Sequence, residues 1–127
     1  MIQDSIKLTG ELRITVTNPK GNVKHEVVVP NLVVTAGKNL IASRLKDTTD
    51  AAMSHMAIGT GSTAAAAGDT TLGTEAGRVA LTSTTVTANA VAYVATFGAG
   101  TGSGAITEAG LFNASSSGDM LCRTVFS

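Results

Sequence analysis

The chain has 127 residues with nine basic and nine acidic side chains, so its formal net charge at neutral pH is zero. This length fits one domain, and the balanced charge argues against nucleic-acid binding, which normally needs a basic surface to meet the phosphates. Hydrophobic residues make up 43% of the chain but aromatic residues only 3%, so the core is thin and contacts with other copies or another protein are expected to add stability.

The first expected element is a β-hairpin. Apolar residues occupy the even positions from Ile6 to Val16, which predicts a strand with one buried face, with a bend or bulge at Gly10. Asn18-Pro-Lys-Gly-Asn22 provides the turn, because Pro presets φ and Gly accepts positive φ. Val23 to Val29 then forms the returning strand, and Pro30-Asn31 interrupts it.

The one expected helix covers about residues 36–46. Thr35 is its expected N-cap. A helix of about three turns is marginal alone, so it must pack on a sheet. The face expected to make that contact contains the residues that recur at helical spacing, namely Gly37, Leu40, Ile41, Arg44 and Leu45.

The chain is organised around a long loop of small residues. A short apolar strand, Met53–Gly59, leads into the loop Thr60–Thr74, and Glu75–Thr87 is expected to follow as one strand. Loops of this length in compact domains are usually functional or ordered by a partner. The loop has no group that performs acid–base or nucleophilic chemistry unaided, which favours a contact surface.

Three more strands complete the prediction. Val91–Phe97 alternates cleanly and forms a second hairpin with the preceding strand through Ala88-Asn89. A flexible Gly98–Gly104 connection leads to the strands Ala105–Phe112 and Met120–Phe126. With about eight strands and one short helix, the sequence predicts an all-β fold, an antiparallel β-sandwich or jelly roll, as one domain over residues 1–127 with a short N-terminal arm.

No enzyme chemistry, cofactor or metal ion is expected. The Gly59–Ala64 run only superficially matches a dinucleotide fingerprint, because a Thr-rich strand follows it in place of a helix. His25 and His55 lie on different strands with no clustered ligands. The lone Cys122 is expected to be a small buried hydrophobe. No signal peptide or membrane-spanning stretch is expected, which favours a protein made in a reducing compartment.

Four charged residues in or beside strands are more informative: Glu75, Arg78, Glu108 and Arg123. A charge flanked by apolar neighbours usually has a partner, because leaving it buried and unpaired is costly. The first alternative is an internal pair such as Arg123 with Glu108. The second is a charge pair across a subunit contact.

Several motifs resemble those of small virion proteins of tailed bacteriophages. They are His55-Met-Ala-Ile-Gly-Thr-Gly61, Asp69-Thr-Thr-Leu72 with Glu75 and Arg78, Ala105-Ile-Thr-Glu-Ala-Gly-Leu-Phe-Asn113, and Met120-Leu-Cys-Arg123. Together they cover roughly residues 31–126 as short motifs. Within this group, the chain is most similar to the jelly-roll cement or decoration proteins of podophage heads. The Ile-x-Glu-x-Gly-Leu-Phe motif also occurs in phage tail-fibre and tail-collar proteins.

This resemblance implies a non-catalytic structural protein that binds the outside of a bacteriophage capsid and clamps neighbouring major capsid proteins. It implies self-association, with a dimer expected, and a virion location after synthesis in the host bacterial cytoplasm. The alternative is a tail-fibre or tail-collar component involved in tail assembly or host recognition. The segments expected to make partner or self contacts are Met1–Lys7, Thr60–Thr74 and Gly98–Gly104, and the residues expected to carry these contacts are Ile2, Asp4, Lys7, Thr60, Ser62, Asp69, Thr71, Leu72, Thr101 and Ser103.

Overall fold

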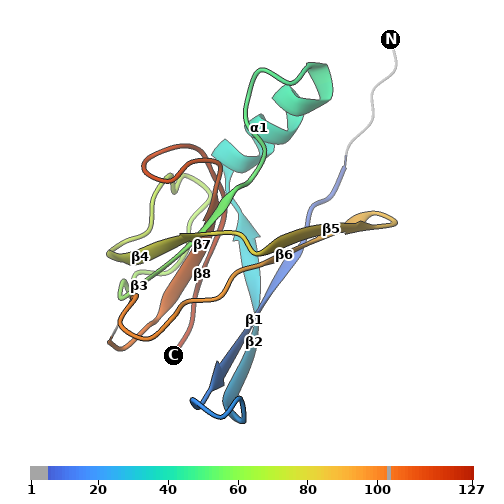
Figure 1. Cartoon of the computed structure of the whole chain (residues 1–127). Coiled ribbons are helices and arrows are strands. Elements are labelled where there is room, and N and C mark those ends of the chain that lie inside the picture. The colour runs from blue at the N-terminus through green and yellow to red at the C-terminus, as the bar shows by residue number, and fades with distance from the viewer. Residues whose placement is uncertain (1–5, 103) are drawn as a thin grey trace.

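The computed structural model describes residues 6–102 and 104–127. Within that part of the chain the fold is all-β, with eight strands in two sheets and one helix (Figure 1). The larger sheet has six strands in the order β1-β2-β8-β7-β3-β4, and every neighbouring pair is antiparallel. The smaller sheet is the two-stranded ribbon β5–β6. The predicted all-β class is therefore confirmed.

The first hairpin is confirmed, with β1 at Gly10–Thr17 and β2 at Val23–Val33. The predicted interruption at Pro30-Asn31 is not observed. Strand β2 continues through these two residues and changes its pairing partner after them. Its earlier residues pair with β1, and its last two, Leu32 and Val33, pair with β8. Strand β1 begins at Gly10, and the irregularity lies between Val16 and Thr17 instead. Proline is tolerated because it sits where one ladder ends.

Helix α1 spans Thr35–Lys46, close to the predicted range. Thr35 is not the N-cap, because Val34 occupies that position and no side chain caps the helix. The predicted contact face is only half right. Gly37 and Leu40 are buried, but Leu45 is 77% exposed. A Cβ on Gly37 would lie 2.2 Å from the carbonyl oxygen of Leu121, so the first turns of α1 touch β8 directly.

The next segment differs from the prediction of one long strand. Strand β3 covers His55–Gly59 and pairs with both β7 and β4. Residues 75–87 form two strands, β4 at Glu75–Ala80 and β5 at Ser83–Thr87, with a break at Leu81 and Thr82. Strand β4 closes the edge of the large sheet, whereas β5 leaves it and pairs with β6 at Ala90–Val94. The Thr-rich run has no apolar alternation that marks this break.

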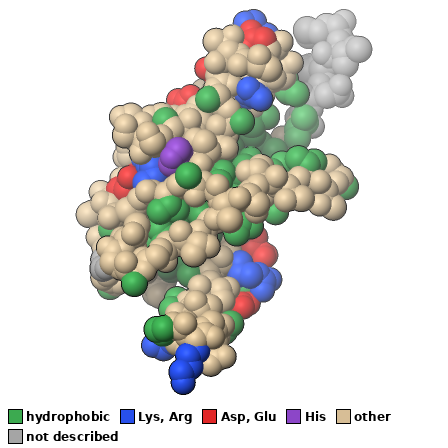
Figure 2. All heavy atoms as spheres, in the orientation of Figure 1, with side chains coloured by type: hydrophobic (Ala, Val, Ile, Leu, Met, Phe, Trp, Pro, Cys, Tyr) green, Lys and Arg blue, Asp and Glu red, His purple; other side chains and the backbone are tan. Residues whose placement is uncertain are grey.

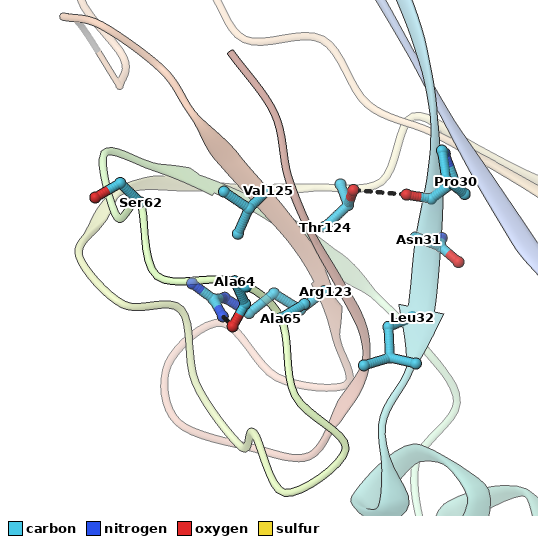
Figure 3. Close-up of a pocket in the computed structure, with 9 residues that line it drawn as sticks. All are labelled: Pro30, Asn31, Leu32, Ser62, Ala64, Ala65, Arg123, Thr124 and Val125. Carbon is cyan, nitrogen blue, oxygen red and sulfur yellow. Dashed lines mark hydrogen bonds between the residues drawn. The ribbon is translucent and has the colours of Figure 1, made fainter.

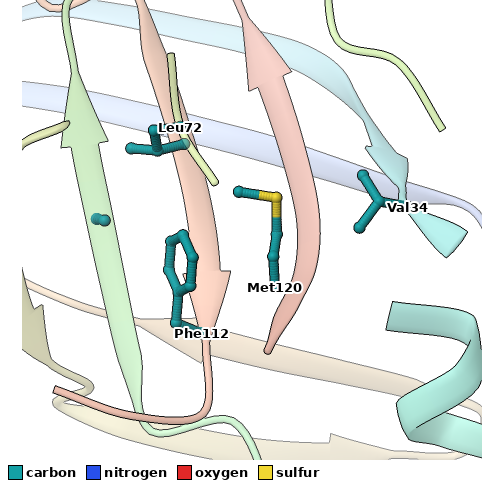
Figure 4. Packing of buried hydrophobic residues seen from close by; sticks show 5 residues of the cluster. Val34, Leu72, Phe112 and Met120 are labelled. Atoms are coloured by element: carbon teal, nitrogen blue, oxygen red, sulfur yellow. The ribbon is translucent and has the colours of Figure 1, made fainter. Parts of the chain in front are cut away.

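The last two strands, β7 at Glu108–Phe112 and β8 at Met120–Val125, form the buried centre of the large sheet. The hydrophobic core is small and lies on one face of these strands (Figure 4). Its members are Val34 just before α1, Ala57 of β3, Leu72 of the long loop, Phe112 at the end of β7 and Met120 at the start of β8. The ribbon β5–β6 lies towards the opposite face, beside a large groove.

Candidate interaction surface

Glu108 and Arg123 form a buried ion pair between β7 and β8. Glu108 is fully buried and Arg123 is 3% exposed. The Nε and Nη2 atoms of Arg123 donate to Oε2 of Glu108 at 3.0 and 2.9 Å. The internal-pair alternative predicted from the sequence is therefore confirmed.

The same carboxylate fixes both ends of the long loop after β3. Oε1 of Glu108 accepts hydrogen bonds from the amides of Gly61 at 2.8 Å and Thr74 at 2.7 Å, and Oε2 accepts one from Gly73 at 2.9 Å. This geometry requires a residue without a side chain at Gly61, because a Cβ there would lie 2.5 Å from Oε1. The loop therefore begins and ends on one buried carboxylate.

Arg123 holds the middle of the loop (Figure 3). Its Nη1 atom donates to Asp69 at 2.8 Å, and its Nη2 atom donates to the carbonyl of Thr63 at 3.0 Å. Asp69 also accepts a hydrogen bond from the amide of Ala66 at 2.9 Å. Glu108, Arg123 and Asp69 thus connect the loop to the sheet at several points, and we call them the loop anchor.

The charged groups of the loop anchor interact with one another and with backbone amides of the loop. Burial alone would raise the pKa of Glu108, but the amides of Thr74 and Gly73 and the guanidinium of Arg123 outweigh it and hold that pKa below its ordinary value. The amide of Ala66 is the main cause that lowers the pKa of Asp69, and Arg123 adds to it. Both carboxylates are therefore ionised at neutral pH and accept bonds from the protein, so this arrangement is suited to rigidity and not to proton transfer.

A second set of contacts fixes the turn between β7 and β8. Arg78 pairs with Glu75 through two bonds of 2.7 and 3.1 Å. It also donates to the carbonyls of Ala114 and Ser117, and its guanidinium lies 3.8 Å from the ring centroid of Phe112. The other two charges singled out from the sequence are therefore also internal partners.

The predicted contact residues fall into separate groups. We call the loop Thr60–Thr74 the anchored loop. Thr60, Ser62 and Thr71 are exposed on it, and Asp69 is partly buried in the loop anchor. Thr101 is exposed, and its loop lies against Gly77 of β4. Lys7 is exposed at a different place, a groove described below. Ile2, Asp4 and Ser103 lie outside the described residues.

The position of Leu72 does not fit the predicted partner contact. It is 5% exposed and belongs to the hydrophobic core, so it is not available to a partner (Figure 4). Its role is to hold the loop from below, next to the loop anchor. A single Leu in a run of Ala, Thr and Gly is the signal that could have identified this role, since a large apolar side chain in such a loop gains most by burial.

The two concavities near these elements differ in size. The smaller, about 460 Å³, lies between the anchored loop and β2 and includes Ser62, Asn31 and Thr124 (Figure 3). The larger is a groove of about 1320 Å³ bounded by β1, α1 and strand β6 of the ribbon. We call it the ribbon groove. Sequence reasoning did not find it, because it depends on where β5 leaves the large sheet.

The described residues contain no cluster of three His, Cys, Asp or Glu side chains that could hold a metal ion. Cys122 is buried, and burial raises the pKa of its thiol to about 11. In the same part of the chain, no helix has the length and apolar character needed to cross a membrane.

Comparisons with known proteins add no identification. No protein-family model, curated protein or solved structure matches the chain.

Proposed function

We propose that this protein is a structural virion protein that binds the outer surface of a bacteriophage capsid and clamps neighbouring major capsid proteins. The observation that carries the proposal is the anchored loop. Its exposed side chains are small, and its backbone is held from below by a fully buried carboxylate and a buried arginine. The resemblance of several motifs to those of phage virion proteins motivates the choice of partner.

An anchored loop suits binding to a protein surface for a physical reason. A loop that orders only on binding loses conformational entropy at that moment, and this loss weakens the complex. Here the ordering is already met by hydrogen bonds within the chain. Small side chains such as Thr60, Ser62 and Thr71 also allow a flat partner surface to approach the backbone closely.

Repetition on a shell strengthens such a contact. A specific interface usually buries about 1,200–2,000 Å² in total. A clamp that touches two neighbouring subunits divides this area into two smaller contacts, and the second forms at a high effective concentration once the first is made. Weak individual contacts therefore suffice for stable binding.

A tail-fibre or tail-collar component is the second candidate. The observation that favours it is the β1–β2 hairpin, which projects from the body of the molecule (Figure 1). Val16, Val23 and Val28 of this hairpin are exposed. A projecting apolar hairpin is suited to packing along a neighbouring subunit in an elongated assembly.

The test mixes the purified protein with capsids that lack it and images them by cryo-electron microscopy. We expect ordered density on the outer shell and greater resistance of the capsids to heat. Ser62→Lys and Thr71→Lys add a long charged side chain to the anchored loop and should reduce occupancy. Thr17→Lys, at an exposed position on the β1–β2 hairpin, is the matched control. Bare capsids with the unmodified protein would refute the capsid proposal and favour the tail alternative.

A further inference from the structure

The ribbon groove has apolar side chains on three sides, and Lys7, Glu11, Arg13 and Arg44 also line it. One wall contains Leu8, which precedes β1, and Leu12 of β1. The other walls contain Ile41 and Leu45 of α1 and Val91 and Val94 of β6. The floor includes Leu111 and Cys122 of the large sheet. Figure 2 shows hydrophobic side chains gathered between the helix and the ribbon and along the ribbon itself. A contiguous apolar surface of this kind on a soluble chain usually marks an interaction site.

The ribbon β5–β6 has one apolar face that the single chain leaves largely uncovered. The register pairs Val86 with Val91 and Thr84 with Tyr93, so these four side chains share a face. Tyr93 is half-buried, whereas Val86 is 70% exposed and Val91 47% exposed. Every residue of β5 is exposed. An isolated two-stranded hairpin is at best marginally stable in water, so this ribbon gains from being covered.

The chain as a whole exposes more surface than a compact monomer of its mass. The chain exposes 8157 Å², whereas a compact monomer of 12.7 kDa exposes about 6,200 Å². Even if residues 1–5 were as exposed as an unfolded chain, they would account for about 800 Å² of the difference. The remaining excess of about 1,100 Å², which the ribbon shares with the projecting β1–β2 hairpin, exceeds the roughly 800 Å² that each partner buries in a standard interface.

The charges of this surface fit a second copy of this chain, because the ribbon is uncharged and the groove carries both signs. The ribbon from Ser83 to Val94 has no charged residue. The groove is lined by charges of both signs, namely Lys7, Glu11, Arg13 and Arg44, and Arg13 pairs with Glu26 at 2.7 Å. The chain also carries both halves of a complementary contact, an apolar ridge at Val86 of β5 and the groove that Val91 of β6 lines, as a two-fold symmetric contact requires.

We propose that the ribbon and the ribbon groove form one self-association surface, and that its occupant is the same surface of a second copy of this chain related by a two-fold axis. The ridge of each copy then lies in the groove of the other. This inference is independent of the capsid proposal, because it rests on the β5–β6 side of the molecule and not on the anchored loop.

Sedimentation velocity over roughly 1–100 µM protein tests the inference, because interfaces of standard size span micromolar to much tighter affinities. We expect a species of twice the 12.7 kDa chain mass. Val86→Lys and Val91→Lys should weaken dimerisation by about 100-fold or more, because the two-fold axis places each buried charge in the interface twice. The matched control is Val23→Lys, which replaces a 61% exposed valine outside the groove.

Far-UV circular dichroism should show that all three variants keep the folded structure. A monomer at the highest concentration would overturn the inference and leave the groove to a different protein. A trimer would also overturn it, because a two-fold contact closes at two copies. Equal dimerisation of Val86→Lys, Val91→Lys and Val23→Lys would show that another surface makes the contact. Capsid binding is scored separately, so failure of either proposal is distinguishable from failure of the other.

Discussion

The loop anchor predicts a large stability loss for Glu108→Gln, a substitution that keeps the volume of the side chain and removes its charge. The amide keeps one good acceptor oxygen, but its NH₂ group then faces donors from the amides of Gly61, Gly73 or Thr74 and from Arg123. At least one buried donor is left without an acceptor. Arg123 also loses its fully buried counter-charge, although Asp69 remains.

The magnitude follows from these contacts. Breaking a buried ion pair by removing one partner typically costs 3–5 kcal/mol, and an orphaned buried donor about 1–3 kcal/mol, with some overlap between the two. We therefore expect the free energy of unfolding to fall by about 4 kcal/mol. A chain of 127 residues has a total of about 6–19 kcal/mol, so this loss is a large fraction. The melting temperature should fall by roughly 12–20 °C.

The assay is urea unfolding at pH 7, followed by circular dichroism at one fixed protein concentration, because self-association would shift apparent stability. The control is Glu26→Gln, which removes the exposed ion pair with Arg13 and should cost no more than about 1 kcal/mol. If Glu108→Gln unfolds within about 1 kcal/mol of the unmodified protein, the loop anchor does not stabilise the fold as described.

Three further predictions concern pH, packing and thiol reactivity. The pKa values of Glu108 and Asp69 are lowered in the folded protein, so the unfolded chain binds more protons at acidic pH. The urea midpoint should therefore be constant above about pH 5 and fall as the pH decreases through the folded-state pKa values. A midpoint that stays constant down to about pH 3 would contradict this prediction. Gly37→Ala should lower the melting temperature despite the roughly 1 kcal/mol helix preference of Ala, because its Cβ would meet the Leu121 carbonyl; a higher melting temperature would refute that close contact. Cys122, buried and with its thiol pKa raised to about 11, should react with a thiol reagent at pH 8 only after unfolding, and fast labelling of the folded protein would show that β8 opens.

The sequence predicts well where a residue's environment is set by its neighbours in the strand. Alternation from Ile6 to Val16 and from Val23 to Val29 identified the first hairpin, because a period of two has one structural interpretation. Arg123 lies between apolar residues of the same strand, and the cost of an unpaired buried charge predicted its partner Glu108 correctly.

Prediction failed where tertiary contacts decide between locally equivalent states. The run from Glu75 to Thr87 has β propensity throughout, so nothing local marks the break at Leu81, where the chain leaves the large sheet. Leu45 has the spacing of a buried residue but is exposed, because the helix touches β8 near Gly37 and then extends beyond the sheet. Helical period gives the apolar face, and only the position of the sheet determines how much of that face is covered.

The two faces of the large sheet have different energetic characters, and this difference bears on how a clamp can work. One face is covered by a loop whose charges and backbone donors are satisfied within the chain, so a partner can bind there without reordering it. The other face is covered, among the described residues, by the two-stranded ribbon and flanked by α1 and β1, and it leaves apolar surface open. The proposed capsid contact and the proposed dimer contact therefore use two separate surfaces. Lysines at Ser62 and Thr71 should therefore leave the proposed dimer intact, while lysines at Val86 and Val91 should leave the anchored loop intact and reduce binding to a lattice only through lost avidity.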